Sequence, residues 1–215
     1  MRKCAGPMEK NSLIQQYLNE ILPEAKCALV FSNPFECLCA VMLSAQTTDK
    51  SVNEVTPKLF ANYPDAFALS KADVKDVEAI IKTLGLYRNK AKNLVGIATA
   101  LVERYGGEVI NDKKALTSLP GVGIKTANVV CAEYFGVPAI AVDTHLSRVS
   151  KRLGLAKDDD EPIEIEKKLE RRFPKEDWIK LHHQMIWFGR LYCKAISPQC
   201  ESCKLQGICR YFKKK

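Results

Sequence analysis

The segment LPGVGIKTANVV occupies residues 119–130. Pro120 and Gly121 suit the two central positions of a type II turn, because proline fixes its own φ and glycine tolerates a positive φ. Gly123 then precedes a helical pattern that runs from Ile124 to Val130. The segment therefore predicts two helices joined by a glycine-rich hairpin.

This hairpin would turn backbone N–H groups outward at the start of a helix, where they form an anion site. Such amides bind phosphate without reading base sequence, and the missing side chains of Gly121 and Gly123 would let a DNA backbone approach closely. A turn between two helices without any ligand is the alternative, and it is the more common meaning of an isolated Pro-Gly-x-Gly. We name both glycines as candidate DNA-binding positions.

The helix after the hairpin has a lysine, Lys125, in its first turn. Lys125 and Asn128 are expected to share one face. The helix dipole disfavours a positive charge in the first turn, so a neutral, nucleophilic amine is easier to obtain there. A solvated surface lysine is the alternative. The face that we expect to be buried consists of Ile124, Ala127, Val130, Cys131 and Tyr134.

Helical patterns dominate the rest of the chain. Asn33 can cap a helix that starts at Pro34 and runs to about Leu43, and Glu36 can complete a capping box. The best strand-like stretch, residues 138–142, is too short to found a sheet. Glycine and proline breakers divide the chain into roughly ten short helices, so the predicted fold class is all-α. Two further core stripes at helical spacing are Val52, Val55, Leu59 and Phe60, and Ala91, Leu94, Ile97, Ala98 and Leu101.

Two acidic segments are placed to start helices. Asp143 is a natural N-cap for a pattern that continues to Leu153, and residues 158–161 precede Pro162. As single observations, these acids indicate structural roles. His145 alone indicates packing or hydrogen bonding rather than catalysis.

The chain of 215 residues has 33 Lys and Arg against 25 Asp and Glu, a formal net charge of +8. This excess suits a polyanion such as DNA, although solvated faces such as residues 167–172 and the tail 210–215 are an alternative. Residues 1–8 lack the apolar stretch of a signal peptide, and no run reaches the roughly 18 apolar residues that span a membrane. We expect a cytoplasmic protein without a membrane partner. The length leaves one compact body or two small lobes open.

Nine cysteines in a cytoplasmic protein indicate thiols or metal ligands before disulfides. A C-x6-C-x2-C-x5-C array in the tail supplies four thiolates suited to one metal centre. A structural zinc site is the alternative, but zinc arrays usually present two close C-x2-C pairs, whereas this array has one. We favour an iron–sulfur cluster held by Cys193, Cys200, Cys203 and Cys209. Buried apolar thiols are expected for the others, Cys4, Cys27, Cys37, Cys39 and Cys131.

Residues 119–128, residues 142–145 and the cysteine array together resemble the endonuclease III family of helix-hairpin-helix DNA glycosylases in order and spacing. The similarity also includes LSAQTTD at 43–49 and GLY at 85–87, and spans about Asn33 to Cys209. It implies two helical lobes with DNA bound across the cleft between them. One lobe, residues 27–137, is a six-helix barrel with the hairpin. The other, residues 1–26 with 138–215, holds a [4Fe-4S] cluster.

The resemblance also implies an activity. The family removes oxidised or ring-saturated pyrimidines from duplex DNA and cleaves 3′ to the abasic site by β-elimination. Lys125 matches its catalytic lysine and Asp143 its catalytic aspartate, while Gln46 and Leu86 match residues that enter the duplex where the damaged nucleotide leaves. Lys194, in the loop of the cysteine array, is a candidate phosphate contact. The family expectation is a monomer.

One departure and three alternatives accompany this interpretation. Ile124 stands where many relatives carry a basic residue, which puts substrate preference in doubt. The adenine-removing branch of the superfamily typically lacks a lysine at position 125 and adds a C-terminal recognition domain. A DNA-binding module without chemistry would be signalled by loss of Lys125 or Asp143. An iron–sulfur electron carrier would leave the hairpin and the positive charge unexplained.

Overall fold

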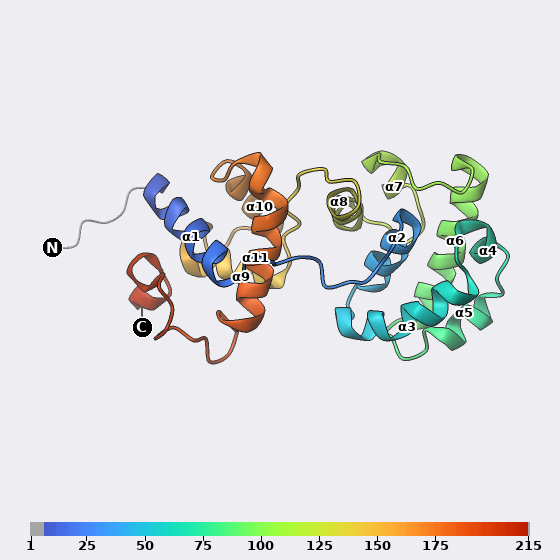
Figure 1. Cartoon of the computed structure of the whole chain (residues 1–215), viewed down its shortest axis with the longest axis horizontal. Coiled ribbons are helices and arrows are strands. Elements are labelled where there is room, and N and C mark those ends of the chain that lie inside the picture. Colours follow the sequence, from blue (N-terminus) through green and yellow to red (C-terminus); the bar gives the residue numbers. More distant parts are fainter. Residues whose placement is uncertain (1–6, 215) are drawn as a thin grey trace. The chain divides into compact units, whose positions relative to one another are not determined.

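The computed structural model describes residues 7–214 and divides into two compact units. Unit 1 comprises the described residues of Met1–Lys26 and Pro138–Lys215, and unit 2 is Cys27–Val137. Every regular element in the described residues is helical (Figure 1), which confirms the all-α prediction. Cys4 and most of the segment considered for a signal peptide lie outside the described residues.

Unit 2 is built around α2, a helix that is buried over most of its surface. Cys37, Cys39 and Leu43 are among its residues with no exposed surface, as expected for a helix that is apolar on all sides. α2 packs on α3, α6 and α8. The helices of unit 2 are α2 (Pro34–Leu43), α3 (Asp49–Asn62), α4 (Ala66–Ser70), α5 (Val74–Ile80), α6 (Tyr87–Tyr105), α7 (Lys113–Thr117) and α8 (Ile124–Glu133).

The start of α2 confirms the predicted cap and corrects the predicted capping box. Asn33 Oδ1 accepts a hydrogen bond of 2.8 Å from the backbone N–H of Glu36. The Glu36 carboxylate, however, accepts from both the N–H and the hydroxyl of Ser32, each at 2.7 Å, instead of from the N–H of Asn33. Ser32 offers two donors where Asn33 would offer one, so the carboxylate reaches one residue further back.

The two predicted core stripes lie on α3 and α6. Val52, Val55 and Leu59 are buried and Phe60 packs against them half-buried, while all five residues of the α6 stripe are buried. α6 also packs on α4 and α5. This long helix therefore forms one wall of the core of unit 2.

Unit 1 combines a helix from the start of the chain with helices from its second half. α1 and α9 both pack on α11. The Tyr17 and Phe188 rings meet edge to face at 6.2 Å, and Gln184 Nε2 donates to Asn19 Oδ1 at 3.0 Å. The elements of unit 1 are α1 (Pro7–Ile21), α9 (Thr144–Leu153), α10 (Pro162–Glu170), η1 (Lys175–Asp177), α11 (Trp178–Leu191), η2 (Gln206–Ile208) and η3 (Phe212–Lys214).

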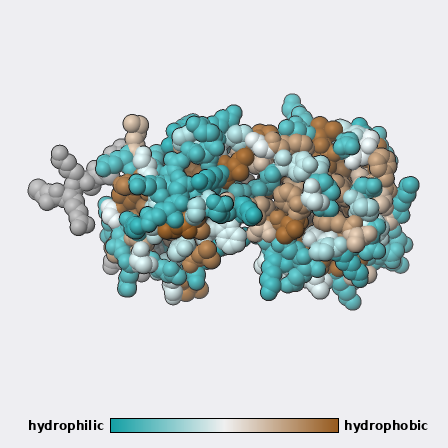
Figure 2. All heavy atoms as spheres, in the orientation of Figure 1, coloured by the Kyte–Doolittle hydropathy of each residue, from teal (hydrophilic) through white to brown (hydrophobic). Residues whose placement is uncertain are grey.

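The acidic run at residues 158–161 starts α10 as predicted. Glu161 is the N-cap, Pro162 occupies the first turn, and Glu161 and Glu164 form a capping box. Lys168 Nζ bonds to Asp160, whereas Lys167, Arg171 and Arg172 are exposed. Hydrophilic side chains gather over α10 (Figure 2), in agreement with the solvated face considered above. In the described part of the chain, no helix is both long and apolar enough to cross a membrane.

Candidate active site and metal centre

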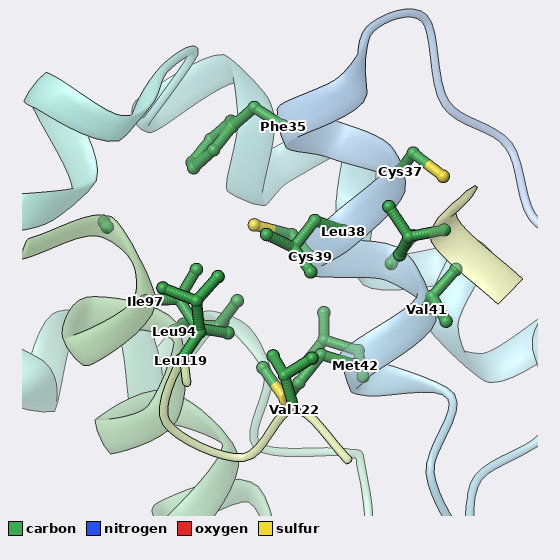
Figure 3. Packing of buried hydrophobic residues seen from close by; sticks show 14 of the residues in the cluster. Phe35, Cys37, Leu38, Cys39, Val41, Met42, Leu94, Ile97, Leu119 and Val122 are labelled. Atoms are coloured by element: carbon green, nitrogen blue, oxygen red, sulfur yellow. The ribbon is translucent and has the colours of Figure 1, made fainter. Parts of the chain in front are cut away.

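The hairpin between α7 and α8 has the predicted turn. Gly121 adopts a φ of 72°, and the N–H of Val122 donates to the carbonyl of Leu119 at 3.2 Å. Leu119 and Val122 are buried and lie beside Met42, Leu94 and Ile97 in the core of unit 2 (Figure 3). The two ends of the turn are therefore anchored, and its tip faces solvent.

Two glycines allow α6 and the turn to approach closely. A Cβ on Gly121 would lie 2.3 Å from Asn93 Nδ2, and a Cβ on Gly96 would lie 3.1 Å from Pro120 Cγ. Gly123 is exposed, and a Cβ there would meet nothing within 4 Å. Gly121 is thus required by the packing of the turn, whereas Gly123 leaves open space at the start of α8.

Lys125 is exposed in the first turn of α8, next to this open space. The predicted buried stripe of α8 is correct at its centre, where Ala127, Val130 and Cys131 are buried. It is wrong at both ends, because Ile124 is 75% exposed and Tyr134 is 41% exposed.

Asn128 was expected on the face of Lys125, and this expectation is also wrong. Asn128 is only 6% exposed, and among the described residues its buried Oδ1 has no hydrogen-bond partner. The buried surface of α8 is centred between Ala127 and Cys131, so Asn128 turns inward while the apolar residues at the helix ends project beyond the core. Periodicity alone does not fix that centre.

Asp143 caps α9 as predicted. Its Oδ1 accepts a hydrogen bond of 2.7 Å from the N–H of Leu146, and the residue is half-buried. The preceding residues 138–142 are in neither helix nor strand, and residues 139–142 are buried. His145 Nδ1 lies 3.3 Å from the Arg148 guanidinium. Burial lowers the pKa of His145, against the opposing effect of the Asp143 carboxylate.

Gln46 and Leu86 share an uncommon backbone conformation. Their φ angles are 55° and 58°, and among the described residues Ser197 is the remaining non-glycine residue with a positive φ. Both side chains are exposed, Leu86 to 58%. A Cβ on Gly85 would lie 3.9 Å from the carbonyl oxygen of Gln46, so the two loops are adjacent. Strained positions of this kind concentrate at functional sites.

The four cysteines of the array line one pocket in unit 1, together with Leu153, Phe188 and Tyr192. All four are half-buried free thiols. Burial raises the pKa of the Cys193 and Cys203 thiols, so a bound metal would be needed to hold them as thiolates. Four convergent thiols in an otherwise largely apolar pocket fit a metal cluster. Outside this array Cys37, Cys39 and Cys131 are buried as expected, whereas Cys27 is half-buried.

Arg152, at the end of α9, holds the first part of this array. Its guanidinium donates to the carbonyls of Lys194 at 2.6 Å, Ala195 at 3.1 Å and Cys193 at 3.3 Å, and it stacks on the Tyr211 ring at 4.3 Å. The side chain of Lys194 is exposed. Sequence analysis did not single out Arg152, because a basic residue in the last turn of a helix is explained by the helix dipole alone.

Comparison with known proteins defines the class. Residues 39–175 match the family described as HhH-GPD superfamily base excision DNA repair protein. Endonuclease III of Bacillus subtilis is 52% identical over 193 residues, which are 90% of this chain and 88% of that relative. The fold and the hairpin therefore belong to the helix-hairpin-helix class of base excision repair proteins.

Two solved structures narrow the class. A non-covalent endonuclease III–DNA complex has a TM-score of 0.92 at 49% identity and covers 96% of this chain and 97% of that one. A trapped endonuclease III–DNA covalent intermediate has a TM-score of 0.89 at 50% identity and covers 95% of this chain and 97% of that one. The chain belongs to the endonuclease III family of base excision repair DNA glycosylases and lyases, which act on damaged DNA.

Proposed function

We propose that this enzyme removes oxidised or ring-saturated pyrimidines from duplex DNA and cleaves 3′ to the abasic site, with Lys125 as nucleophile and Asp143 as its catalytic partner. The observation that carries the proposal is the exposed Lys125 in the first turn of α8, directly after an anchored hairpin with open space at Gly123. The family relationship supports the same assignment.

The chemistry requires a neutral amine at Lys125. The amine attacks the sugar C1′, a C–N bond to Nζ forms, and the bond from C1′ to the base breaks as the base leaves with a proton. The Asp143 carboxylate stabilises positive charge that develops on the sugar. Ring opening gives a Schiff base, whose iminium acidifies the C2′ proton. Loss of that proton expels the 3′ phosphate, and water then releases Lys125.

DNA binding is assigned to five further positions. The damaged nucleotide must leave the stack, and inserted side chains offset the cost of unstacking. Gln46 and Leu86, exposed on adjacent strained loops, are the proposed inserted residues. The amides at Gly121 and Gly123 are proposed to bind the phosphate backbone, since both glycines are exposed. Lys194 is the proposed phosphate contact of unit 1.

A [4Fe-4S] cluster bound by Cys193, Cys200, Cys203 and Cys209 fits the four thiols of the pocket. When bound, such a cluster would cross-link the C-terminal segment and needs no redox role in the reaction. We assign unit 1 as the cluster domain and unit 2 as the six-helix barrel domain. A monomer acting on double-stranded DNA in the cytoplasm, and at the nucleoid in a prokaryote, is the proposed state.

Borohydride trapping tests the central assignment. Duplex DNA that contains thymine glycol or an abasic site is incubated with the enzyme and borohydride, and the covalent adduct is resolved by electrophoresis. Wild type is expected to form the adduct and Lys125→Gln to lose it. Lys114→Gln, at an exposed lysine of α7, is the matched control and is expected to behave as wild type.

Two other outcomes would overturn the assignment. Base release by wild type without any adduct would mean a glycosylase without lyase chemistry. Neither adduct nor release, in protein shown to be folded by circular dichroism, would favour a DNA-binding module without catalysis.

A further inference from the structure

Lys90 is a buried lysine next to the loop that carries Gln46. It lies in the first turn of α6, is 4% exposed, and its Nζ donates a hydrogen bond to Thr47 Oγ1. Burial lowers the pKa of the Lys90 amine. Holding an ammonium out of water against a hydroxyl is unfavourable, and an apolar side chain would fill the same space at lower cost. The amine therefore calls for an explanation other than core packing.

The hydrogen bonds of Thr47 connect the residues on either side of Gln46. Thr47 Oγ1 accepts from Lys90 and lies 3.4 Å from the carbonyl oxygen of Ala45, to which it donates. The Thr47 N–H donates to the carbonyl of Ser44 at 3.1 Å. The side-chain bonds thus join the residues on either side of Gln46, whose φ of 55° is unfavourable for a residue with a side chain.

Lys90 also contacts the second strained loop. Its backbone N–H donates to the carbonyl of Leu86 at 3.0 Å, the first hydrogen bond of α6. Leu86 is the left-handed residue before α6 and has no side-chain cap. One residue therefore bonds to Leu86 through its main chain and to the Gln46 loop through its side chain.

We propose that Lys90 is a positioning residue that, through Thr47, holds the Gln46 loop beside Leu86 in the conformation that enters the DNA duplex. This inference rests on the insertion role proposed above for Gln46 and Leu86. A loop strained in its free state needs such a support, because otherwise it would relax and each binding event would have to order it again.

Two variants break the bond from opposite ends. Lys90→Met removes the amine and keeps the apolar stem, and Thr47→Val removes the hydroxyl. Each is expected to slow base release from a thymine glycol duplex about tenfold, the scale of one lost hydrogen bond to a charged group. The fluorescence rise of a 2-aminopurine placed beside the lesion, which reports unstacking, is expected to fall in parallel. Cleavage of a single-stranded abasic oligonucleotide, which has no stack to open, is expected to change less than about twofold.

Matched variants separate the bond from general damage. Lys92→Met, at an exposed lysine of α6, and Thr47→Ser, which keeps the hydroxyl, are expected to behave as wild type. If both partners act through one bond, the double variant is expected to lose no more than the worse single variant. Melting temperatures of all variants show whether any of them is unfolded. If Lys90→Met is unfolded, the result for Thr47→Val tests the inference instead.

Three results would overturn the inference. Equal losses on the duplex and single-stranded substrates would mean a structural role, and wild-type base release by Thr47→Val would mean no role. Gln46→Ala and Leu86→Ala are measured alongside. If the Gln46 and Leu86 variants reduce base release and the Lys90 and Thr47 variants do not, only the positioning role of Lys90 is contradicted. If the Gln46 and Leu86 variants leave base release unchanged, the insertion role is contradicted, and the inference that rests on it is contradicted too.

Discussion

Left-handed backbone at single residues has two different causes in unit 2. Gly121 adopts it because the type II turn requires it, and glycine does so without strain. Gln46 and Leu86 adopt it with side chains attached, which costs about 1–3 kcal/mol each. The conformation of Gly121 is a requirement of the turn itself, whereas the strained conformations of Gln46 and Leu86 have to be stabilised by neighbours such as Lys90.

Substitution of three glycines separates strain from close packing. Gly121→Ala meets both a positive φ and Asn93, so we expect a loss of about 3 kcal/mol of stability, or roughly 6–12 °C in Tm. Gly136→Ala has a φ of 67° but open space, so a loss of about 1 kcal/mol is expected. Gly123→Ala, which has neither problem, should leave the Tm unchanged. Thermal unfolding followed by circular dichroism measures all three; equal losses for Gly121→Ala and Gly136→Ala would contradict the role of Asn93.

For single residues, the sequence predicts those backbone conformations that depend only on neighbouring residues in the chain. Pro120 and Gly121 define their turn without reference to the rest of the chain. The conformation of Gln46 and the burial of Lys90 depend on neighbours that are distant in sequence, since Lys90 bonds to a residue 43 positions away. A lysine in a helical pattern indicates a solvated face by default, and nothing local marks this one as buried.

Single helices were predictable where their caps and stripes are complete. The starts of α2, α9 and α10 follow from Asn33, Asp143 and Glu161, because each of these side chains satisfies a free N–H of the first turn. The buried and exposed faces of α8 were not predictable in this way, because its apolar residues extend beyond the buried surface at both ends. Ile124, where the family resemblance implies a basic residue, is exposed beside Lys125 and is free to contact a ligand.

Arg152 connects α9 to the cysteine array. Arg152→Lys keeps the charge but loses the fork that reaches the carbonyls of Lys194 and Ala195 together. We expect the metal cluster to be lost about tenfold faster in excess chelator, followed by its visible absorbance, on the scale of one lost hydrogen bond to a charged group. Arg171→Lys, at an exposed arginine after α10, is the control. Unchanged kinetics in Arg152→Lys would show that the cysteines alone hold the segment.

For the molecule as a whole, the cysteine array belongs to one unit and the hairpin to the other. Removal of the metal cluster is expected to reduce amide protection from hydrogen exchange in α9 and α11, because the pocket is lined by Leu153 and Phe188 from these helices. Protection of α2 and α6 in unit 2 should persist. Hydrogen-exchange mass spectrometry of cluster-free protein measures both, and a uniform loss across the chain would contradict the prediction.

The composition of unit 1 has a consequence for synthesis on the ribosome. Unit 2 is one continuous segment and can form as soon as it has emerged, whereas α1 leaves the exit tunnel early and must wait for α11. Gln15, in α1, bonds to Asp177 at a separation of 162 residues. Until that partner is translated, the apolar face of α1 around Ile14 and Leu18 has nothing from its own unit to cover it. Chaperone capture and mispairing between nascent chains should therefore concentrate on α1, and the metal centre can mature only after Cys209, the last of its four cysteines, has been translated.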